Sequence, residues 1–418
     1  MSGHVVVIGA GVIGLCTALY CAQRGLRVTL VERNGEQRSG CSFENTGMIV
    51  PSHFIPLAAP GAVAQALKWM CDSRSPFYVK PRASWELIDW GLKFWQASSA
   101  AHVRRAAPVL RDLSLASRAC YEALARDDND FQLRATGALM LCKTGQALEE
   151  EARCAEQARD LGLRAEVLDA DATAALEPGV RMDIAGAVHF AQDCNLVPDR
   201  LIAGLQRRLA RYDVRFAWNS EATGWRIDAG KRIRAVRLAA SQEIEADEFV
   251  LAAGSWSSAL ARSLDLPIPL QAGKGYSLTL SNPRQLPRMC AILTEARVAV
   301  SPMGGALRFG GTMEIAGLDE RIDAARVRSI IDAVPRYYPD FTPADFEGIR
   351  PWRGLRPCAP DGLPYVGRTA RFSNLLVATG HAMMGVSLGP ITGRLIAQLA
   401  SGEQPELDLA LLSPDRYH

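Results

Sequence analysis

The sequence lacks an excess of charge of either sign. Its 418 residues include 47 Lys and Arg against 45 Asp and Glu, for a net charge of +2, with neither an acidic tail nor a long basic run. Nothing therefore argues for binding to nucleic acid or for bulk electrostatic attraction to a membrane. The six histidines show no metal-ligand spacing, so no metal site is expected.

Regular cysteine spacing is also absent. The ten cysteines are scattered without a CxxC pair, which speaks against a disulfide framework in a chain of this length. Internal repeats and low-complexity segments are missing as well. With 48% apolar residues, the chain is predicted to be a globular cytoplasmic protein with reduced, mostly buried thiols and two to three domain-sized units.

One long uncharged stretch, residues 5–22, has the length of a membrane span and could also be interpreted as a signal peptide. No basic segment precedes it, and its glycines have a phosphate-binding spacing. We therefore interpret it as part of a soluble strand–turn–helix unit.

Gly9, Gly11 and Gly14 form a GxGxxG pattern between a predicted strand at 4–8 and a predicted helix at 12–24. The first glycine permits a tight turn, the second lets the backbone approach a pyrophosphate, and the third lets the helix pack closely on the strand. The N-terminus of the helix offers unpaired N–H groups and a partial positive charge to the phosphates. The pattern predicts a dinucleotide site.

Glu32 follows Gly14 by eighteen residues, at the end of a second predicted strand at 27–31. Its carboxylate can accept hydrogen bonds from both ribose hydroxyls, and an acid at this place disfavours the 2′-phosphate of NADP. The fingerprint alone does not choose between FAD and NAD.

Later segments make that choice by resemblance. They are the polar loop 39–49, the strand and turn 250–257, the cluster 354–367 that begins Gly-Leu-Arg-Pro, and the glycine loop 380–390. In this order they resemble the D-amino-acid oxidase superfamily of flavoproteins, from about residue 3 to 400. Within it the chain looks most like bacterial D-amino-acid dehydrogenases, with glycine oxidase and sarcosine oxidase as close relatives. The segment 380–385 resembles members that act on D-proline or hydroxy-D-proline.

The resemblance implies an α/β fold, in which a Rossmann-like FAD-binding domain is interleaved with a mixed-sheet α+β substrate domain. The alternation of βα units with antiparallel stretches agrees with this expectation. The expected boundaries are 1–53, 195–268 and 352–418 for the FAD-binding domain, and 54–194 and 269–351 for the substrate domain.

The implied activity is FAD-dependent oxidative deamination of D-amino acids. A hydride passes from Cα to flavin N5, and the electrons continue to a quinone or another acceptor. The alternative within the superfamily is a glycine- or sarcosine-type oxidase that uses oxygen and makes hydrogen peroxide. An NAD-dependent reductase and a nonenzymatic scaffold with FAD as a structural cofactor are alternatives from other classes.

The resemblance also implies site residues. Arg356 is expected to bind the substrate carboxylate through two parallel N–H donors, with a structural salt bridge as the alternative. Tyr276 is expected to add a hydrogen bond or cover the site, and His381 to lie close to flavin or substrate; packing roles are the alternatives for both. The residues expected to bind noncovalent FAD are Gly9, Gly11, Val12, Ile13, Gly14, Glu32, Arg33, Ser42, Asn45, Thr46, Gly47, Val197, Ala253, Gly254, Gly380, Met384 and Gly385.

Four of the eight tryptophans are Trp69, Trp85, Trp90 and Trp95. Helical periodicity over 85–101 favours a small packed helical subdomain, and contact with a membrane or a partner is the alternative. A peripheral position at the inner membrane is therefore the alternative to a purely cytoplasmic location.

Overall fold

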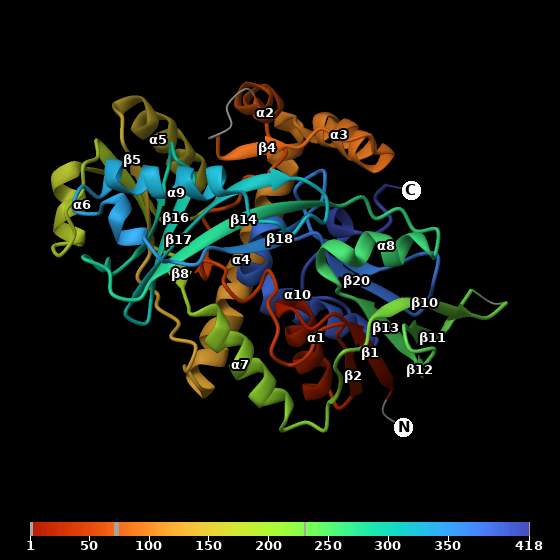
Figure 1. Ribbon diagram of the computed structural model, residues 1–418. Helices are drawn as coiled ribbons and strands as arrows, with labels where there is room; N and C mark the ends of the chain where they lie inside the picture. The colour runs from red at the N-terminus through yellow and green to blue at the C-terminus, as the bar shows by residue number, and fades with distance from the viewer. Residues whose placement is uncertain (1–2, 71–74, 230, 418) are drawn as a thin grey trace.

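The fold consists of two lobes, each built around a β-sheet, which lie side by side in the computed structural model (Figure 1). The structure describes residues 3–70, 75–229 and 231–417. The first lobe contains a six-stranded sheet with the order β19-β20-β13-β1-β2-β9; the β19–β20 pair is antiparallel and the other neighbours are parallel. Its strands are β1 (His4–Ile8), β2 (Arg27–Val31), β9 (Arg215–Ala217), β13 (Glu248–Leu251), β19 (Tyr365–Arg368) and β20 (Leu375–Thr379).

The sequence of β1, HVVVI, explains its central position. All five residues are buried, as apolar runs are in parallel strands that are covered on both faces. Val5 and Val7 join one hydrophobic core, whereas Val6 and Ile8 join another. The covering elements are α1 (Val12–Gln23), α4 (Ala100–Asp127), α7 (Pro198–Leu209) and α10 (Gly385–Ala400) on one face, and β10 (Ala222–Ile227), β11 (Ile233–Leu238), β12 (Glu243–Glu245) and α8 (Ser257–Arg262) on the other.

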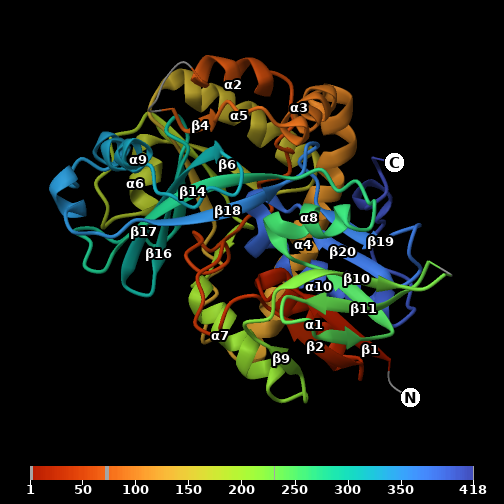
Figure 2. The same cartoon turned by 45° about the vertical axis from the view of Figure 1, so that its right-hand side comes forward.

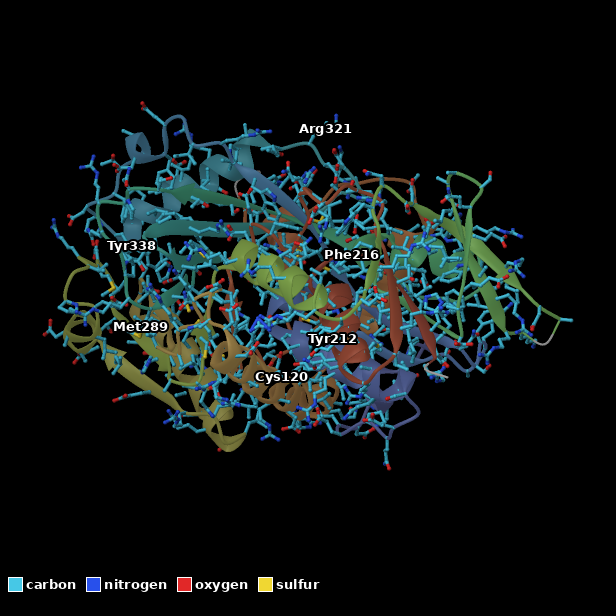
Figure 3. All side chains as sticks on the ribbon, turned by 90° about the horizontal axis from the view of Figure 1, so that it is seen from below. Cys120, Tyr212, Phe216, Met289, Arg321 and Tyr338 are labelled. Carbon is cyan, nitrogen blue, oxygen red and sulfur yellow. The ribbon has the colours of Figure 1, made fainter. Side chains whose placement is uncertain are left out.

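The second lobe contains a nine-stranded mixed sheet, in which eight strands follow the order β18-β14-β17-β16-β15-β5-β7-β6 and β4 pairs with β17. Leu278 and Phe309 of this sheet share a core with α9, and Figure 3 shows Met289 and Tyr338 of that core in the same lobe. The strands are β4 (Phe77–Val79), β5 (Ala138–Cys142), β6 (Ala165–Asp169), β7 (Gly186–Phe190), β14 (Gln271–Leu280), β15 (Cys290–Leu293), β16 (Val298–Met303), β17 (Ala306–Ile315) and β18 (Trp352–Cys358). The helices are α2 (Ala62–Met70), α3 (Trp85–Ala97), α5 (Gly145–Asp160), α6 (Ala170–Leu176) and α9 (Ala324–Tyr337); a short pair, β3 (Met48–Ile49) and β8 (Cys194–Asn195), lies outside both sheets.

The predicted fold class is confirmed, because a largely parallel sheet and a mixed sheet are built from alternating stretches of the chain. The strands expected at 4–8 and 27–31 occupy those residues, and the helix expected at 12–24 is α1. The domain boundaries stay a prediction. Strand β18 lies in the segment 352–418 that was expected to belong to the FAD-binding domain. It pairs, however, with β14 in the nine-stranded sheet of the second lobe.

The tryptophan-rich segment differs from the expected packed subdomain. It forms α2, β4 and α3, which lie at the outer rim of the molecule in both ribbon views (Figures 1 and 2). Trp90 is buried, but Trp85 and Trp95 are exposed, and no residue of α2 is buried. Sequence periodicity identified α3 correctly but not which of its tryptophans pack.

Helix α10 packs along α1 through two glycines one turn apart. A Cβ at Gly389 would lie 2.9 Å from Val12, and a Cβ at Gly393 would lie 2.5 Å from the backbone carbonyl carbon of Cys16. The two helices therefore approach to backbone contact, which only glycine permits. This contact brings the N-terminus of α10 next to that of α1.

Replacing Gly393 with alanine should destabilise the protein by about 1–3 kcal/mol, because the added methyl group forces α1 and α10 apart. The measurement is thermal or urea unfolding of the flavin-loaded protein. Gly91→Ala is the matched control, since Gly91 also lies inside a helix but a Cβ there meets nothing within 4 Å. Equal stabilities of the two variants would contradict the proposed contact.

Candidate active site

A cavity of about 440 Å³ opens at the carboxyl ends of the parallel strands. The residues that follow β1, β2 and β13 line it, and so do the last residues of β20. Ligands of open α/β sheets bind at this edge, where the strands end and the chain turns into helices. The cavity is therefore the candidate site.

The three glycines of the fingerprint have the geometry that their spacing predicts. Gly9 has a φ of +106°, and a Cβ there would lie 2.5 Å from the carbonyl oxygen of Ala252. A Cβ at Gly14 would overlap the carbonyl oxygen of Gly9, so the helix can approach its strand only with glycine at this place. Gly11 precedes α1 without a side-chain cap, and the first turn of α1 lines the cavity. This turn suits a pyrophosphate.

Glu32 is buried at the end of β2 and lines the cavity. One carboxylate oxygen accepts a 2.9 Å hydrogen bond from the backbone N–H of Ala10. The other accepts from the backbone and side-chain nitrogens of Asn34, at 3.0 and 3.1 Å. These bonds orient the carboxylate, and the oxygen that accepts from Ala10 keeps a further lone pair for a ribose hydroxyl.

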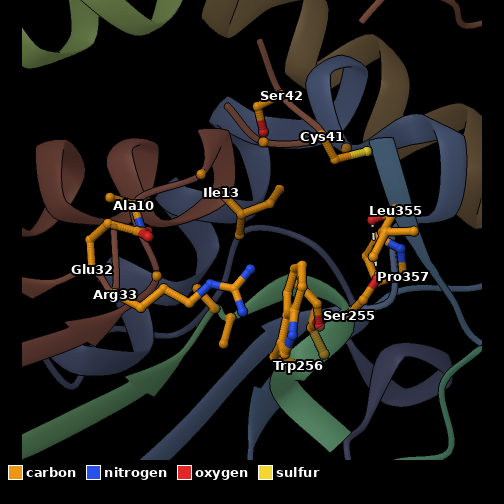
Figure 4. Close-up of a pocket in the computed structure, with 18 of the residues that line it drawn as sticks. Ala10, Ile13, Glu32, Arg33, Cys41, Ser42, Ser255, Trp256, Leu355 and Pro357 are labelled. Carbon is orange, nitrogen blue, oxygen red and sulfur yellow. Dashed lines mark hydrogen bonds between the residues drawn. The ribbon is translucent and has the colours of Figure 1, made fainter. Parts of the chain in front are cut away.

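Figure 4 shows Arg33 reaching across the cavity to Trp256. The guanidinium carbon lies 3.6 Å from the centre of the indole ring, a cation–π contact. Arg38 donates a 2.7 Å hydrogen bond to the carbonyl oxygen of Ala10 and also lines the cavity. The fingerprint did not identify Arg38 or Trp256, although Trp256 lies in the strand-and-turn segment that carries the family resemblance.

The opposite end of the cavity is formed by the loop 39–45, by β18 and by the start of α10. Ser42 accepts a 3.1 Å hydrogen bond from the N–H of Val12, which fixes the loop on α1. Cys41, Leu355 and Pro357 lie together at this end, far from Glu32 (Figure 4). None of these three had been predicted as a site residue.

Arg356 is half-buried beside this end of the cavity. Its Nη1 donates a 2.6 Å hydrogen bond to the carbonyl oxygen of Thr312, and its guanidinium fills the space where a Cβ of Gly275 would lie. Burial raises the pKa of the nearby Cys41 thiol, and the positive charge of Arg356 opposes that rise. Among residues 3–70, 75–229 and 231–417, no carboxylate forms an ion pair with Arg356. The salt-bridge alternative therefore has no partner in the described chain.

Tyr276 is not brought to the cavity. Its side chain is fully buried and is not among the residues that line the cavity. Its hydroxyl donates a 2.7 Å hydrogen bond to Glu314 and accepts one from the N–H of Asp323. The structure places Tyr276 in the core under α9, and its expected role toward the substrate stays a prediction.

His381 lines the cavity and is buried. Burial lowers its pKa to about 3, so the imidazole stays neutral at physiological pH. Its Nε2 pairs with the hydroxyl of Thr392 at 3.0 Å, and its Nδ1 has no hydrogen-bond partner among the described residues. His381 thus contributes a neutral ring to the cavity wall, and one of its nitrogens is buried.

Val197 is also not brought to the cavity. Its N–H donates a 2.9 Å hydrogen bond to the carbonyl oxygen of Phe131. Val197 immediately precedes α7, and α7 packs on α1. The segment 220–223 lines the cavity instead.

The other predicted residues fall into two groups, and their roles toward FAD or, for Arg356 and His381, toward the substrate stay a prediction. Those that line the cavity are Gly9, Gly11, Val12, Ile13, Glu32, Arg33, Ser42, Asn45, Ala253, Gly254, His381 and Gly385. Those that adjoin it without lining it are Gly14, Thr46, Gly47, Gly380, Met384 and Arg356.

The residues present fit a dinucleotide with an aromatic ring system. The glycine turn and the N-terminus of α1 suit phosphates, and the buried carboxylate of Glu32 suits a ribose. The apolar Leu355 and Pro357, with the neutral His381, surround the other end.

Comparison with known proteins identifies this arrangement. A family model described as FAD dependent oxidoreductase matches residues 4–399. The chain belongs to that family. It is therefore an FAD-dependent oxidoreductase, and the resemblance inferred from the sequence is confirmed.

Relatives align over almost the entire chain. The D-amino acid dehydrogenase of Bradyrhizobium diazoefficiens is 32% identical over 99% of this chain and 98% of the relative. That of Granulibacter bethesdensis is 31% identical over 99% of both chains. Both are similar enough in length and sequence to support the family assignment.

Solved structures have the same fold. Glycine oxidase from Geobacillus kaustophilus superposes over all of both chains with a TM-score of 0.79 at 23% identity. L-proline dehydrogenase from P. horikoshii covers all of this chain and is matched over 98% of its own, with a TM-score of 0.73 at 15% identity. These likenesses show the fold alone.

Within the described ranges, no helix has both the length and the apolar character needed to cross a bilayer.

Changing Glu32 to glutamine should weaken FAD binding about ten- to a hundredfold, since a buried amide replaces a charged acceptor, worth about 1.5–3 kcal/mol. Titrating flavin-free protein with FAD and following fluorescence quenching measures the affinity. Glu36→Gln is the control, because Glu36 is an exposed acid in the same loop. Equal FAD affinity of the two variants would contradict the assignment of Glu32 to the FAD site.

Proposed function

We propose that this enzyme dehydrogenates D-amino acids at the carbon–nitrogen bond next to the carboxylate. Nearly full-length similarity to two proteins named D-amino acid dehydrogenase supports this reaction class. The observation that carries the proposal is the guanidinium of Arg356, which lies beside the cavity and has no ion-pair partner in the described chain.

Arg356 is proposed to bind the substrate carboxylate. A guanidinium presents parallel N–H donors that match the two oxygens of a carboxylate, and the pair is strong where water is scarce. Gly275 leaves the space that the guanidinium fills, and its neighbour Gly354 leaves the space that the indole ring of Trp352 fills. A bound carboxylate therefore supplies the negative charge that the protein itself does not.

FAD, when bound, accepts a hydride from the substrate Cα. The chain's own residues have to hold that carbon in one orientation and exclude water from it. No side-chain base is assigned, because an amine bound in its neutral form needs none. The neutral imidazole of His381 lines the cavity without adding a charge to it.

We also propose finer features. The segment 380–385 supports D-proline or hydroxy-D-proline as the substrate. The word dehydrogenase in the names of the relatives supports an acceptor other than oxygen, such as a quinone. A peripheral membrane contact and noncovalent FAD are further parts of the proposal. A glycine- or sarcosine-type oxidase is the second candidate, because the fold of glycine oxidase is so similar.

Anaerobic bleaching of the flavin absorbance across D-amino acids, L-amino acids, glycine and sarcosine tests the function. We expect D-amino acids to bleach the flavin, D-proline fastest, and their L-enantiomers to leave it oxidised. In air, dye reduction should exceed peroxide release. Bleaching by glycine or sarcosine alone, with stoichiometric peroxide, would establish the oxidase instead.

Replacing Arg356 with glutamine should lower kcat/KM at least about a hundredfold, because the carboxylate loses a charged bidentate partner. The FAD content should be unchanged, as Arg356 adjoins but does not line the cavity. Arg356→Lys keeps the positive charge but lacks the two parallel N–H donors of a guanidinium, so it should recover only part of the lost kcat/KM. Tyr276→Phe tests the predicted role of Tyr276, and we expect its KM to be unchanged because the hydroxyl bonds Glu314 instead. An unchanged KM in Arg356→Gln would refute the proposal that Arg356 binds the substrate carboxylate.

A further inference from the structure

Helix α3 has apolar side chains on two separate faces. Leu87, Trp90 and Phe94 face inward and pack against β17 and β18. The other face carries four apolar residues that are exposed: Trp85 (82%), Ile88 (49%), Leu92 (56%) and Trp95 (64%).

The exposed residues form one stripe. At about 100° per residue, positions 85, 88, 92 and 95 fall within about 80° of arc. Water-facing helices usually present polar residues there, and a helix that is apolar on both sides is typical of one with a second covering environment. The stripe has a tryptophan at each end, and the amphipathic indole ring favours the boundary between water and lipid.

The charge around the stripe is positive. Residues 62–70 and 75–105 contain six Lys and Arg and two Asp and Glu, a net charge of +4, which leaves −2 for the rest of the chain. Both acids of α3 are already paired, Glu86 with Arg262 and Asp89 with Lys93. The exposed side chains of Lys68, Arg104 and Arg105 form no ion pair within the described residues.

This charge distribution distinguishes between two occupants of the surface. In a symmetric dimer the stripe would meet its own copy, so that two patches of charge +4 would face each other and repel. Anionic lipid headgroups, in contrast, would be attracted by the same charges. The charge favours a lipid surface.

The inner face of α3 connects this surface to the active site. The indole N–H of Trp90 donates a 2.9 Å hydrogen bond to the carbonyl oxygen of Cys358, two residues from Arg356 on β18. Trp90 and Cys358 also share an apolar cluster with Ala382, which lines the cavity. A membrane that contacts α3 would therefore lie on the side of the lobe that adjoins the cavity.

We propose that the outer face of α3, with α2 beside it, docks this enzyme onto a bilayer that contains anionic lipid. The side chains of Trp85, Ile88, Leu92 and Trp95 enter the headgroup region, and the basic residues contact lipid phosphates. The inference deepens the proposed function, on which it rests for the expectation of a lipid-soluble electron acceptor.

Flotation of the flavin-loaded protein with vesicles tests the docking. Vesicles of equal parts phosphatidylcholine and phosphatidylglycerol are compared with phosphatidylcholine alone. We expect binding to the anionic vesicles, weakened by high salt. The double variant Trp85→Ser/Trp95→Ser should bind at least about tenfold more weakly, and Arg104→Gln/Arg105→Gln about thirtyfold more weakly.

Tyr212→Ser is the matched control, because Tyr212 is an exposed aromatic residue of the first lobe (38%; Figure 3) and should not affect binding. Flavin absorbance and near-UV circular dichroism verify that each variant is folded. Equal vesicle binding by the unmodified protein and the tryptophan variant would overturn the proposal. A second outcome would also overturn it: the unmodified protein is a dimer in sedimentation velocity, the tryptophan variant is a monomer, and neither binds vesicles.

Dye reduction with D-amino acids in the absence of vesicles reports the proposed function separately. If that activity is absent but docking depends on the stripe, the function is refuted and the surface is supported. If activity is present and vesicles are not bound, the surface is refuted and the function stands.

Discussion

The contact between α1 and α10 is the constraint on which the cavity depends. Glycines at 389 and 393 let the two helices touch through their backbones, so that both helix N-termini face the same space. The first turn of α10 is also tied to other elements: the hydroxyls of Ser117 and Tyr121 donate to its carbonyls, and Ser387 accepts from the N–H of Val50. The phosphate end and the ring end of the site are therefore parts of one rigid unit.

The second constraint is the alternation of side chains along β14. The guanidinium of Arg356 fills the space that Gly275 leaves, and the sulfur atoms of Met313 and Cys358 fill the space that Gly273 leaves. Lys274 and Tyr276 point the other way and join Glu314 in a buried polar cluster. A shift of one residue would exchange these two faces, so the register with β18 determines which cation reaches the cavity.

Helix α3 illustrates how one element serves two environments. Its inner face is held by Trp90, whose indole N–H is satisfied by a carbonyl of β18, and its outer face remains exposed in the isolated chain. Single-sequence periodicity identified the helix and its tryptophans. It could not assign the two apolar faces, because both have helical spacing and only packing distinguishes them.

The sequence by itself determined the dinucleotide turn, the acid at the end of β2 and the family, because these depend on local geometry within one βαβ unit and on motifs in a fixed order. Most of the predicted residues that line the cavity come from such segments. Only the tertiary structure decided the rest. Tyr276 and Val197 belong to predicted motifs, yet strand facing and helix packing direct them away from the cavity, while Arg38 and Trp256 reach it from loops. Spacing along the chain cannot decide such cases, because they depend on which surfaces are buried against each other.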